Sequence, residues 1–248
     1  MQEQISVKLF SDVGMGEVFM ARLMHVRNHI LSGVYGLENR QEIEDSIMRV
    51  IFDGLEPAFR SLREVRKEWV DDKVPEKRKR QHIENVYTYL TIAFKDRFQQ
   101  TAKEFGYEIG FIFQKDSTFK KGAQEFILRH PKIGNDLFQL AQDDRATWLS
   151  RMIAVRNIAI DHAGDKGREE VEEMEKRLTP EDAETIFDNC WRAIEDTIII
   201  FVLDKYDEKY GHQLLELAQY RADKNHHERF GWFLIPDHPA NRGNSIEL

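Results

Sequence analysis

One stretch of the chain combines three side chains that can act together on a phosphodiester, namely Arg156, Asn157 and His162. An arginine keeps its charge at every physiological pH and can neutralise phosphate oxygens, whereas a histidine gains and loses protons near neutral pH. These two groups are the minimum needed for acid–base cleavage of a phosphodiester without a metal ion. Gly164 and Gly167 follow, and this glycine pair predicts that the helix carrying the three residues ends there.

The spacing of Arg156 and His162 is not distinctive by itself, because Arg221 and His226 have a similar one. What distinguishes Arg156 is the asparagine directly after it and the glycine pair that follows. On an unbroken helix, six positions of about 100° each place Arg156 and His162 about 120° apart. Because the two side chains then do not converge, a catalytic site requires a second copy of the chain across a two-fold axis.

The composition predicts an all-α fold. Hydrophobic residues make up 41% and charged residues 32% of the 248 residues, as in proteins built from amphipathic helices. Only 14 glycines and 6 prolines leave few tight turns for a sheet. The net charge of −8 argues against indiscriminate coating of nucleic acid, but it leaves room for a local basic groove.

Three further features bear on the compartment. The single cysteine, Cys190, excludes a disulfide within the chain and suits a reducing environment. Residues 1–8 lack the basic and apolar parts of a secretion signal. The most apolar run, residues 197–203, is far too short to span a bilayer. We therefore expect a cytoplasmic protein without a membrane partner.

Apolar residues recur at helical spacing along most of the chain, and they predict a series of long helices. Pro57 either kinks or divides the second of these helices. Thr179 and Pro180, followed by acidic residues, form a strong helix start. The predicted helices cover residues 16–31, 38–72, 76–105, 117–129, 137–162 and 180–206, with one more beyond Gly211.

Two segments are less regular. Residues 106–114 combine glycines, β-branched residues and aromatics, and could form a short strand or an extended loop. Ser117 is then a plausible N-cap for the next helix. In the helix over residues 137–162, we expect a buried stripe made of Leu140, Trp148, Leu149, Met152, Val155 and Ala159.

The pattern Arg156-Asn157 followed by His162 resembles the R-N-x(3–5)-H signature of the HEPN superfamily of all-helical domains. The aromatic helix that enters the pattern, the capped helix after it, and residues 110–122 strengthen the resemblance, which covers roughly residues 76–206. It implies an all-α, HEPN-like helical bundle. With that fold, residues 1–72 form an N-terminal helical extension, residues 73–210 the core, and residues 211–248 a C-terminal helix and irregular tail.

The resemblance also implies a function, which is metal-independent endoribonuclease activity at a composite site in a homodimer. Arg156 would bind and polarise the scissile phosphate, and His162 would move protons during attack by the ribose 2′-OH. Asn157 would orient the site or form a hydrogen bond across the dimer interface. The products would be a 2′,3′-cyclic phosphate and a 5′-OH, with neither metal nor other cofactor needed. A role as a toxin or in anti-phage defence follows by analogy, with a possible antitoxin or regulatory protein as partner. Gly164 occupies the place of a tyrosine that is nucleotidylated in some such toxins, so that control is not expected here.

RNA would also need a track of cations for its backbone. The first candidates are two basic clusters, Lys77, Arg78, Lys79 and Arg80 in one and Lys120 and Lys121 in the other.

Two other interpretations stay open. The chain could be a catalytically inactive HEPN-like domain that binds RNA, a nucleotide or a protein partner, or a purely structural helical module. Arg156 would then pair with an acidic neighbour, and His162 would interact with the helix dipole.

Overall fold

The computed structural model describes residues 7–8, 37–160, 179–210 and 231–232, and of residues 7–8, 156–160, 199, 203, 206–210 and 231–232 it describes the backbone alone. Within these ranges nearly all residues are helical. The exception is a pair of two-residue strands, β1 (Val7–Lys8) and β2 (Gly231–Trp232), which are antiparallel with Val7 opposite Trp232. The predicted all-α class is confirmed.

The chain divides into two compact units, and each is described by itself. One contains residues 1–44 and 198–248, and the other contains residues 45–197. The second unit holds almost all of the described helices, including the one that carries Arg156 and Asn157. The domain limits predicted at residues 72 and 210 remain predictions, as does the HEPN-like topology. The helices predicted over residues 16–31 and beyond Gly211 lie outside the described residues, and β2 falls in the tail that was predicted to be irregular.

The first long helix is continuous but changes its pitch in the middle. It consists of α3 (Arg40–Val50), the π-helical segment η2 (Ile51–Leu55) and α4 (Glu56–Trp69). The N–H of Glu56 donates to the carbonyl of Ile51, five residues back. Pro57 follows at once and has no N–H to donate, so the irregular turn lies where the regular ladder is interrupted. Pro57 therefore neither divides the helix nor ends it.

The second long helix contains α5 (Glu76–Thr91), the π-helical segment η3 (Ile92–Phe98) and α6 (Gln99–Glu104), close to the predicted range 76–105. It ends at Gly106, whose φ of 87° is a conformation that favours glycine. The N–H of Gly106 donates to the carbonyl of Lys103, and the N–H of Tyr107 donates to that of Ala102, each at 2.8 Å. These two bonds satisfy carbonyls that the helix end leaves unpaired.

The strand considered for residues 106–114 is wrong, because the segment ends in a 3₁₀ turn, η4 (Gly110–Phe113). Phe111 and Ile112 are buried in it, and Phe111 packs closely on Gly122 of α7 (Asp116–Arg129). Burial of these side chains under a neighbouring helix, which local sequence does not reveal, decides the conformation. The N-cap of α7 is Lys115 and not Ser117, whereas its end at Arg129 was predicted.

The third long helix comprises α8 (Gly134–Asp144), the π-helical segment η5 (Arg145–Leu149) and α9 (Ser150–Ile160). It begins three residues before the predicted start at Leu137. The predicted buried stripe is confirmed for five of its members, while the side chain of Ala159 lies outside the described set. The buried members are Leu140, Trp148, Leu149, Met152 and Val155.

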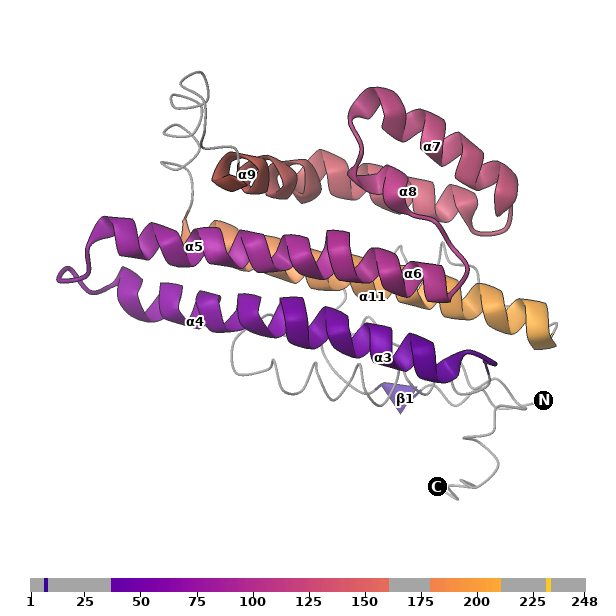
Figure 1. Cartoon of the computed structure of the whole chain (residues 1–248), viewed down its shortest axis with the longest axis horizontal. Helices are drawn as coiled ribbons and strands as arrows, with labels where there is room; N and C mark the ends of the chain where they lie inside the picture. Colours follow the sequence, from indigo (N-terminus) through magenta and orange to yellow (C-terminus); the bar gives the residue numbers. More distant parts are fainter. Residues whose placement is uncertain (1–6, 9–36, 161–178, 211–230, 233–248) are drawn as a thin grey trace. The chain divides into compact units, whose positions relative to one another are not determined.

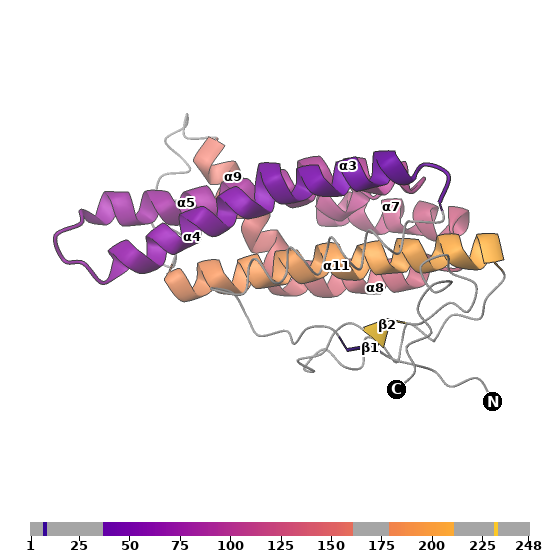
Figure 2. The ribbon, with the colours of Figure 1, turned by 90° about the horizontal axis from the view of Figure 1, so that it is seen from below.

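The last long helix, α11 (Pro180–Tyr210), starts as predicted at the Thr179 cap, where the N–H of Asp182 donates to Thr179 Oγ1 at 3.2 Å. It extends four residues beyond the predicted end at 206. Its part up to Thr197 belongs to the second unit. In that unit, successive long helices run in alternate directions, and α4 lies beside α5 in both views (Figures 1 and 2).

Aromatic and aliphatic side chains join these helices. Phe94 of η3 lies 5.7 Å from Trp148 of η5 between ring centroids, and Phe59 of α4 lies 6.2 Å from Phe187 of α11. Among the helices of the described ranges, none has both the length and the apolar character needed to cross a bilayer.

Candidate functional site

Arg156 and Asn157 lie in the last turns of α9, four and three residues before its final described residue, Ile160. Their side chains and the whole of His162 fall outside what the structure describes. The site can therefore be built from the elements that hold the backbone of Arg156, and the distance between Arg156 and His162 remains a matter of prediction.

The direction of α9 is set by packing as well as by the helix that precedes it. The π-helical segment η5 interrupts the regular hydrogen-bond ladder immediately before Ser150. Trp148 anchors this segment, because its Nε1 donates to Asp144 Oδ1 at 2.9 Å and its ring is buried. Met152 and Val155 then bury the inner face of α9, which packs mainly on α5.

Arg151 connects α9 to the first turn of α11. Its Nη1 and Nη2 donate to Oδ1 and Oδ2 of Asp182 at 3.0 Å and 2.9 Å, which makes the pair bidentate. Both side chains are about one-third exposed, at 37% and 32%. The hydrogen bond to Asp182 raises the pKa of Arg151. Arg151 lies five residues before Arg156 on the same helix.

A second ion pair holds the same turn of α11 from another side. Arg66 of α4 donates to Glu184, and the exposed fractions of the two side chains, 40% and 33%, are close to those of Arg151 and Asp182. The first turn of α11 is thus bound to α4 by one pair and to α9 by the other.

Tyr87 of α5 lies at the Arg151–Asp182 pair and is completely buried. Within the described part of the chain its hydroxyl has no hydrogen-bond partner. Burial raises the pKa of Tyr87, and the charge of Asp182 adds to this effect, whereas Arg151 opposes it. The three residues form a polar group between α5, α9 and α11.

The course of α9 relates Arg156 to the start of α5. Helices α5 and α9 pack together and run in opposite directions (Figure 1), so that the end of α9 and the start of α5 both lie toward the left of that view. The basic first turn of α5 is therefore on the same side of this unit as the end of α9.

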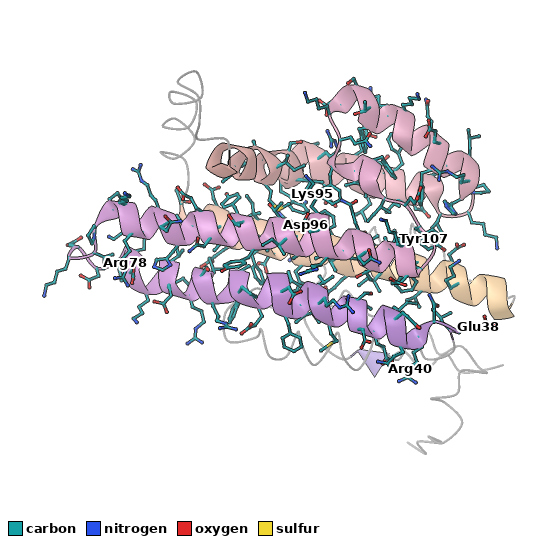
Figure 3. All side chains as sticks on the ribbon, viewed as in Figure 1. Glu38, Arg40, Arg78, Lys95, Asp96 and Tyr107 are labelled. Atoms are coloured by element: carbon teal, nitrogen blue, oxygen red, sulfur yellow. The ribbon has the colours of Figure 1, made fainter. Side chains whose placement is uncertain are left out.

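Three of the four cations in that basic turn have partners (Figure 3 shows Arg78 at this end of α5). Arg78 binds Glu68 through two hydrogen bonds, with Nε 2.9 Å from Oε2, although 63% of its side chain is exposed. Lys79 is buried, and its Nζ donates to the Trp69 carbonyl at 2.9 Å.

Arg80 pairs with Glu76, with 3.5 Å between Nε and Oε1. Lys77, in the same turn, has no ion-pair partner among the described residues. His82 completes the neighbourhood, with Nε2 3.2 Å from Glu68 Oε2. Of the four cations, Lys79 is thus the one engaged in packing between helices.

The second predicted basic cluster is separate from the first. Lys120 and Lys121 are exposed on α7 and have no ion-pair partner in the described ranges. Helix α7 packs on α8 and η4, whereas Lys77 lies at the start of α5 (Figure 1). The structure therefore does not bring Lys120 and Lys121 together with Lys77.

Other reactive groups of the described residues offer no second site. Cys190 is buried, its Sγ faces the Leu90 carbonyl at 3.9 Å, and burial raises the pKa of its thiol well above the usual value, which suppresses the reactive thiolate. No group of three or more metal-binding side chains occurs in the described ranges.

Sequence reasoning missed the Arg151–Asp182 pair, Tyr87 and Glu68. The acidic first turn of α11 was visible as a helix start, but no local pattern links Asp182 to an arginine thirty-one residues away. Glu68 likewise has no feature in the sequence that distinguishes it from any other charged residue near a helix end, and its pairing with Arg78 was not predicted.

No protein-family model matches the chain, and comparison with curated proteins and with solved structures gives no match either.

Proposed function

We propose that this protein is a metal-independent endoribonuclease of the HEPN type, acting as a homodimer. The observation that carries the proposal is the run Arg156-Asn157 with His162, which has the residue types and spacing of that family's motif. Two structural features support it. Arg156 and Asn157 lie near the end of a helix in an all-α unit, and the basic start of α5 lies toward the same side of that unit (Figure 1).

In the proposed reaction, Arg156 binds a non-bridging oxygen of the scissile phosphate and neutralises the charge that grows during attack. His162 moves the proton between the ribose 2′-OH and the leaving 5′-oxygen, and Asn157 orients the reacting groups. The P–O5′ bond breaks as the 2′-oxygen attacks, so that the products are a 2′,3′-cyclic phosphate and a 5′-OH. No water is consumed in this step.

The RNA backbone would approach along Lys77, Arg78 and Arg80. Arg78 is suited to this because Glu68 fixes its guanidinium on one side while most of the side chain stays exposed. Lys120 and Lys121 would contact a longer RNA at a separate place on the unit. The biological role as a toxin or in anti-phage defence, with a possible antitoxin, rests on the family resemblance.

Incubation with labelled RNA in the presence of EDTA tests the proposal. We expect cleavage that survives chelation and yields cyclic-phosphate ends. A substrate with a single 2′-deoxy nucleotide should resist cleavage at that nucleotide, because the nucleophile is missing. Arg156→Ala and His162→Ala should each lower the rate about 100-fold or more. Arg129→Ala removes an exposed arginine of α7 and serves as the control.

Two results would contradict the proposal. Cleavage that disappears in EDTA and returns with a divalent metal would show that the reaction depends on a metal ion. RNA binding without cleavage by the native dimer would favour the inactive HEPN-like binding domain instead.

A further inference from the structure

We propose that Arg151 and Asp182 are positioning residues, which hold the first turn of α9 on α11 so that the backbone of Arg156, five residues further along the same helix, stays in the place the reaction needs. This inference rests on the proposed function. It is drawn from contacts of described side chains that lie outside the Arg156-Asn157-His162 pattern.

The need for such a contact follows from the helix itself. Segment η5 replaces the regular ladder with π-helical turns just before α9, so the direction of α9 is not dictated by α8 alone. Met152 and Val155 bury one face of α9 against its neighbours, but apolar contacts are non-directional and permit sliding. A bidentate arginine–carboxylate pair fixes both the distance and the orientation of α9 relative to α11 at this point.

The position of the pair is suited to this task. Arg151 lies about 7.5 Å along the axis from Arg156, which is less than two helical turns. Asp182 lies in the first turn of α11, where its own N–H is capped by the side chain of Thr179. Arg151 is therefore attached to a helix start that is fixed by its own cap.

Tyr87 of α5 lies close to the pair. Its ring is fully buried between the helices, and its hydroxyl is near enough for the charges of Arg151 and Asp182 to act on it. The pair is therefore bordered by a buried side chain of α5, the helix on which α9 packs.

The Arg66–Glu184 pair provides a matched control. It has nearly the same exposure and binds the same turn of α11, but it reaches α4 and not α9. If the Arg151–Asp182 pair only stabilised the fold, breaking either pair would have similar consequences. If it positions α9, only its loss should affect the reaction.

Kinetics of RNA cleavage separate these cases. We expect Arg151→Gln and Asp182→Asn to lower kcat about 10- to 100-fold with KM changed less than about threefold, because misplacement of a catalytic group affects the transition state more than binding. Arg66→Gln and Glu184→Gln should leave both constants within about twofold. The exchanged pair Arg151→Asp with Asp182→Arg should regain part of the lost kcat. An equal loss in the Arg66→Gln variant, or no loss in Arg151→Gln, would overturn the inference.

Amide hydrogen exchange tests the positioning even if the native protein does not cleave RNA. We expect faster exchange over residues 152–160 in Arg151→Gln, and unchanged exchange there in Arg66→Gln. Absence of native cleavage would refute the proposed function, whereas unchanged exchange in Arg151→Gln would refute the positioning. Each failure is thus recognised separately.

Discussion

Gly54 and Ala93 bring two π-helical segments into direct backbone contact. A Cβ atom at Gly54 would lie 2.6 Å from Ala93 Cα and 2.7 Å from Ala93 N, distances that real Cβ atoms do not occupy. Gly54 belongs to η2 and Ala93 to η3, so both long helices change pitch where they meet. Because the atoms in the way are backbone, the close approach of the helices depends on glycine.

Replacing Gly54 with alanine should therefore destabilise the protein. Overpacking against backbone costs about 1–3 kcal/mol. The better helix propensity of alanine offsets about 1 kcal/mol. We expect a net loss of about 1 kcal/mol, and at most about 2 kcal/mol, in the free energy of unfolding, measured with urea.

Gly110→Ala is the control for this substitution, because its new Cβ would meet only the end of the Gln99 side chain at 3.4 Å. That change should stay within about 0.5 kcal/mol. Adding Ala93→Gly to Gly54→Ala should not restore stability, since Ala93 Cα and N remain in the way. A full rescue would show that only the two methyl groups conflict.

Arg145 holds the 3₁₀ turn and the start of α7 to the third long helix. Its side chain is 10% exposed, Nη1 donates to the Ile112 carbonyl at 2.7 Å, Nη2 pairs with Asp116, and the guanidinium lies 4.6 Å from the Phe119 ring centre. Arg145→Ala should lower the free energy of unfolding by about 2–3 kcal/mol, because it leaves a carbonyl without its donor and removes packing.

The comparison for Arg145 is Arg129→Ala, which breaks a pair with Glu108 in which both side chains are more than half exposed. Such exposed pairs contribute about 0–1 kcal/mol, so little change is expected there. Equal losses in the two variants would contradict the role assigned to Arg145. Denaturation curves monitored by tryptophan fluorescence suffice, because Trp148 lies three residues after Arg145 in η5.

The features that could be predicted are those with a local cause. Thr179 predicts the start of α11 because its side chain caps the first turn of that helix. The apolar residues from Leu140 to Val155 are buried because their spacing places them on one face of a helix. Gly106 ends a helix because its backbone has a positive φ, which glycine adopts more readily than other residues. In each case the residue and its consequence lie within a few positions of one another.

The features that could not be predicted depend on residues far apart in the chain. The π-helical segments form where Gly54 meets Ala93 and where Phe94 meets Trp148, and neither contact has a local signature. In the sequence, Lys79 belongs to a basic cluster that could bind phosphate, whereas in the structure its Nζ donates to the carbonyl of Trp69. For the candidate site, the sequence predicts the helix that carries Arg156 but not the contact of Arg151 with Asp182, because those two residues are thirty-one positions apart.

Tyr87→Phe should be nearly neutral at pH 7, within about 1 kcal/mol, because the buried hydroxyl that it removes has no partner in the described structure. A larger loss would show that the hydroxyl makes a hydrogen bond. Chemical denaturation at pH 7 gives this first comparison.

The same substitution should change the alkaline stability. Burial raises the pKa of Tyr87 in the folded state. The unfolded chain therefore ionises near pH 10 while the folded chain keeps its proton, and stability is lost as the pH rises. The variant should gain about 1 kcal/mol relative to the native protein between pH 10 and pH 11, with no such gain between pH 7 and pH 9. A constant difference at all pH values would contradict this.

Mixed dimers provide the sharpest test of a composite site. A homodimer of Arg156→Ala has two histidines and no arginine at the proposed site, and a homodimer of His162→Ala has the reverse. Each should be inactive. A mixed dimer of the two variants has one intact Arg156 and one intact His162, on different chains. If the site is shared across the two-fold axis, this dimer should regain roughly a tenth to a half of the native rate per dimer.

The matched comparison places both intact residues on one chain, in a dimer of the native protein with the doubly substituted chain Arg156→Ala and His162→Ala. On an unbroken helix these residues project about 120° apart, so the single intact chain should cleave far more slowly than the mixed dimer of single variants. Two affinity tags isolate each mixed dimer for rate measurements in EDTA. Equal activity in the two arrangements, or a native protein that cleaves RNA as a monomer, would mean that one copy holds a complete site and that the helix does not continue regularly from Arg156 to His162.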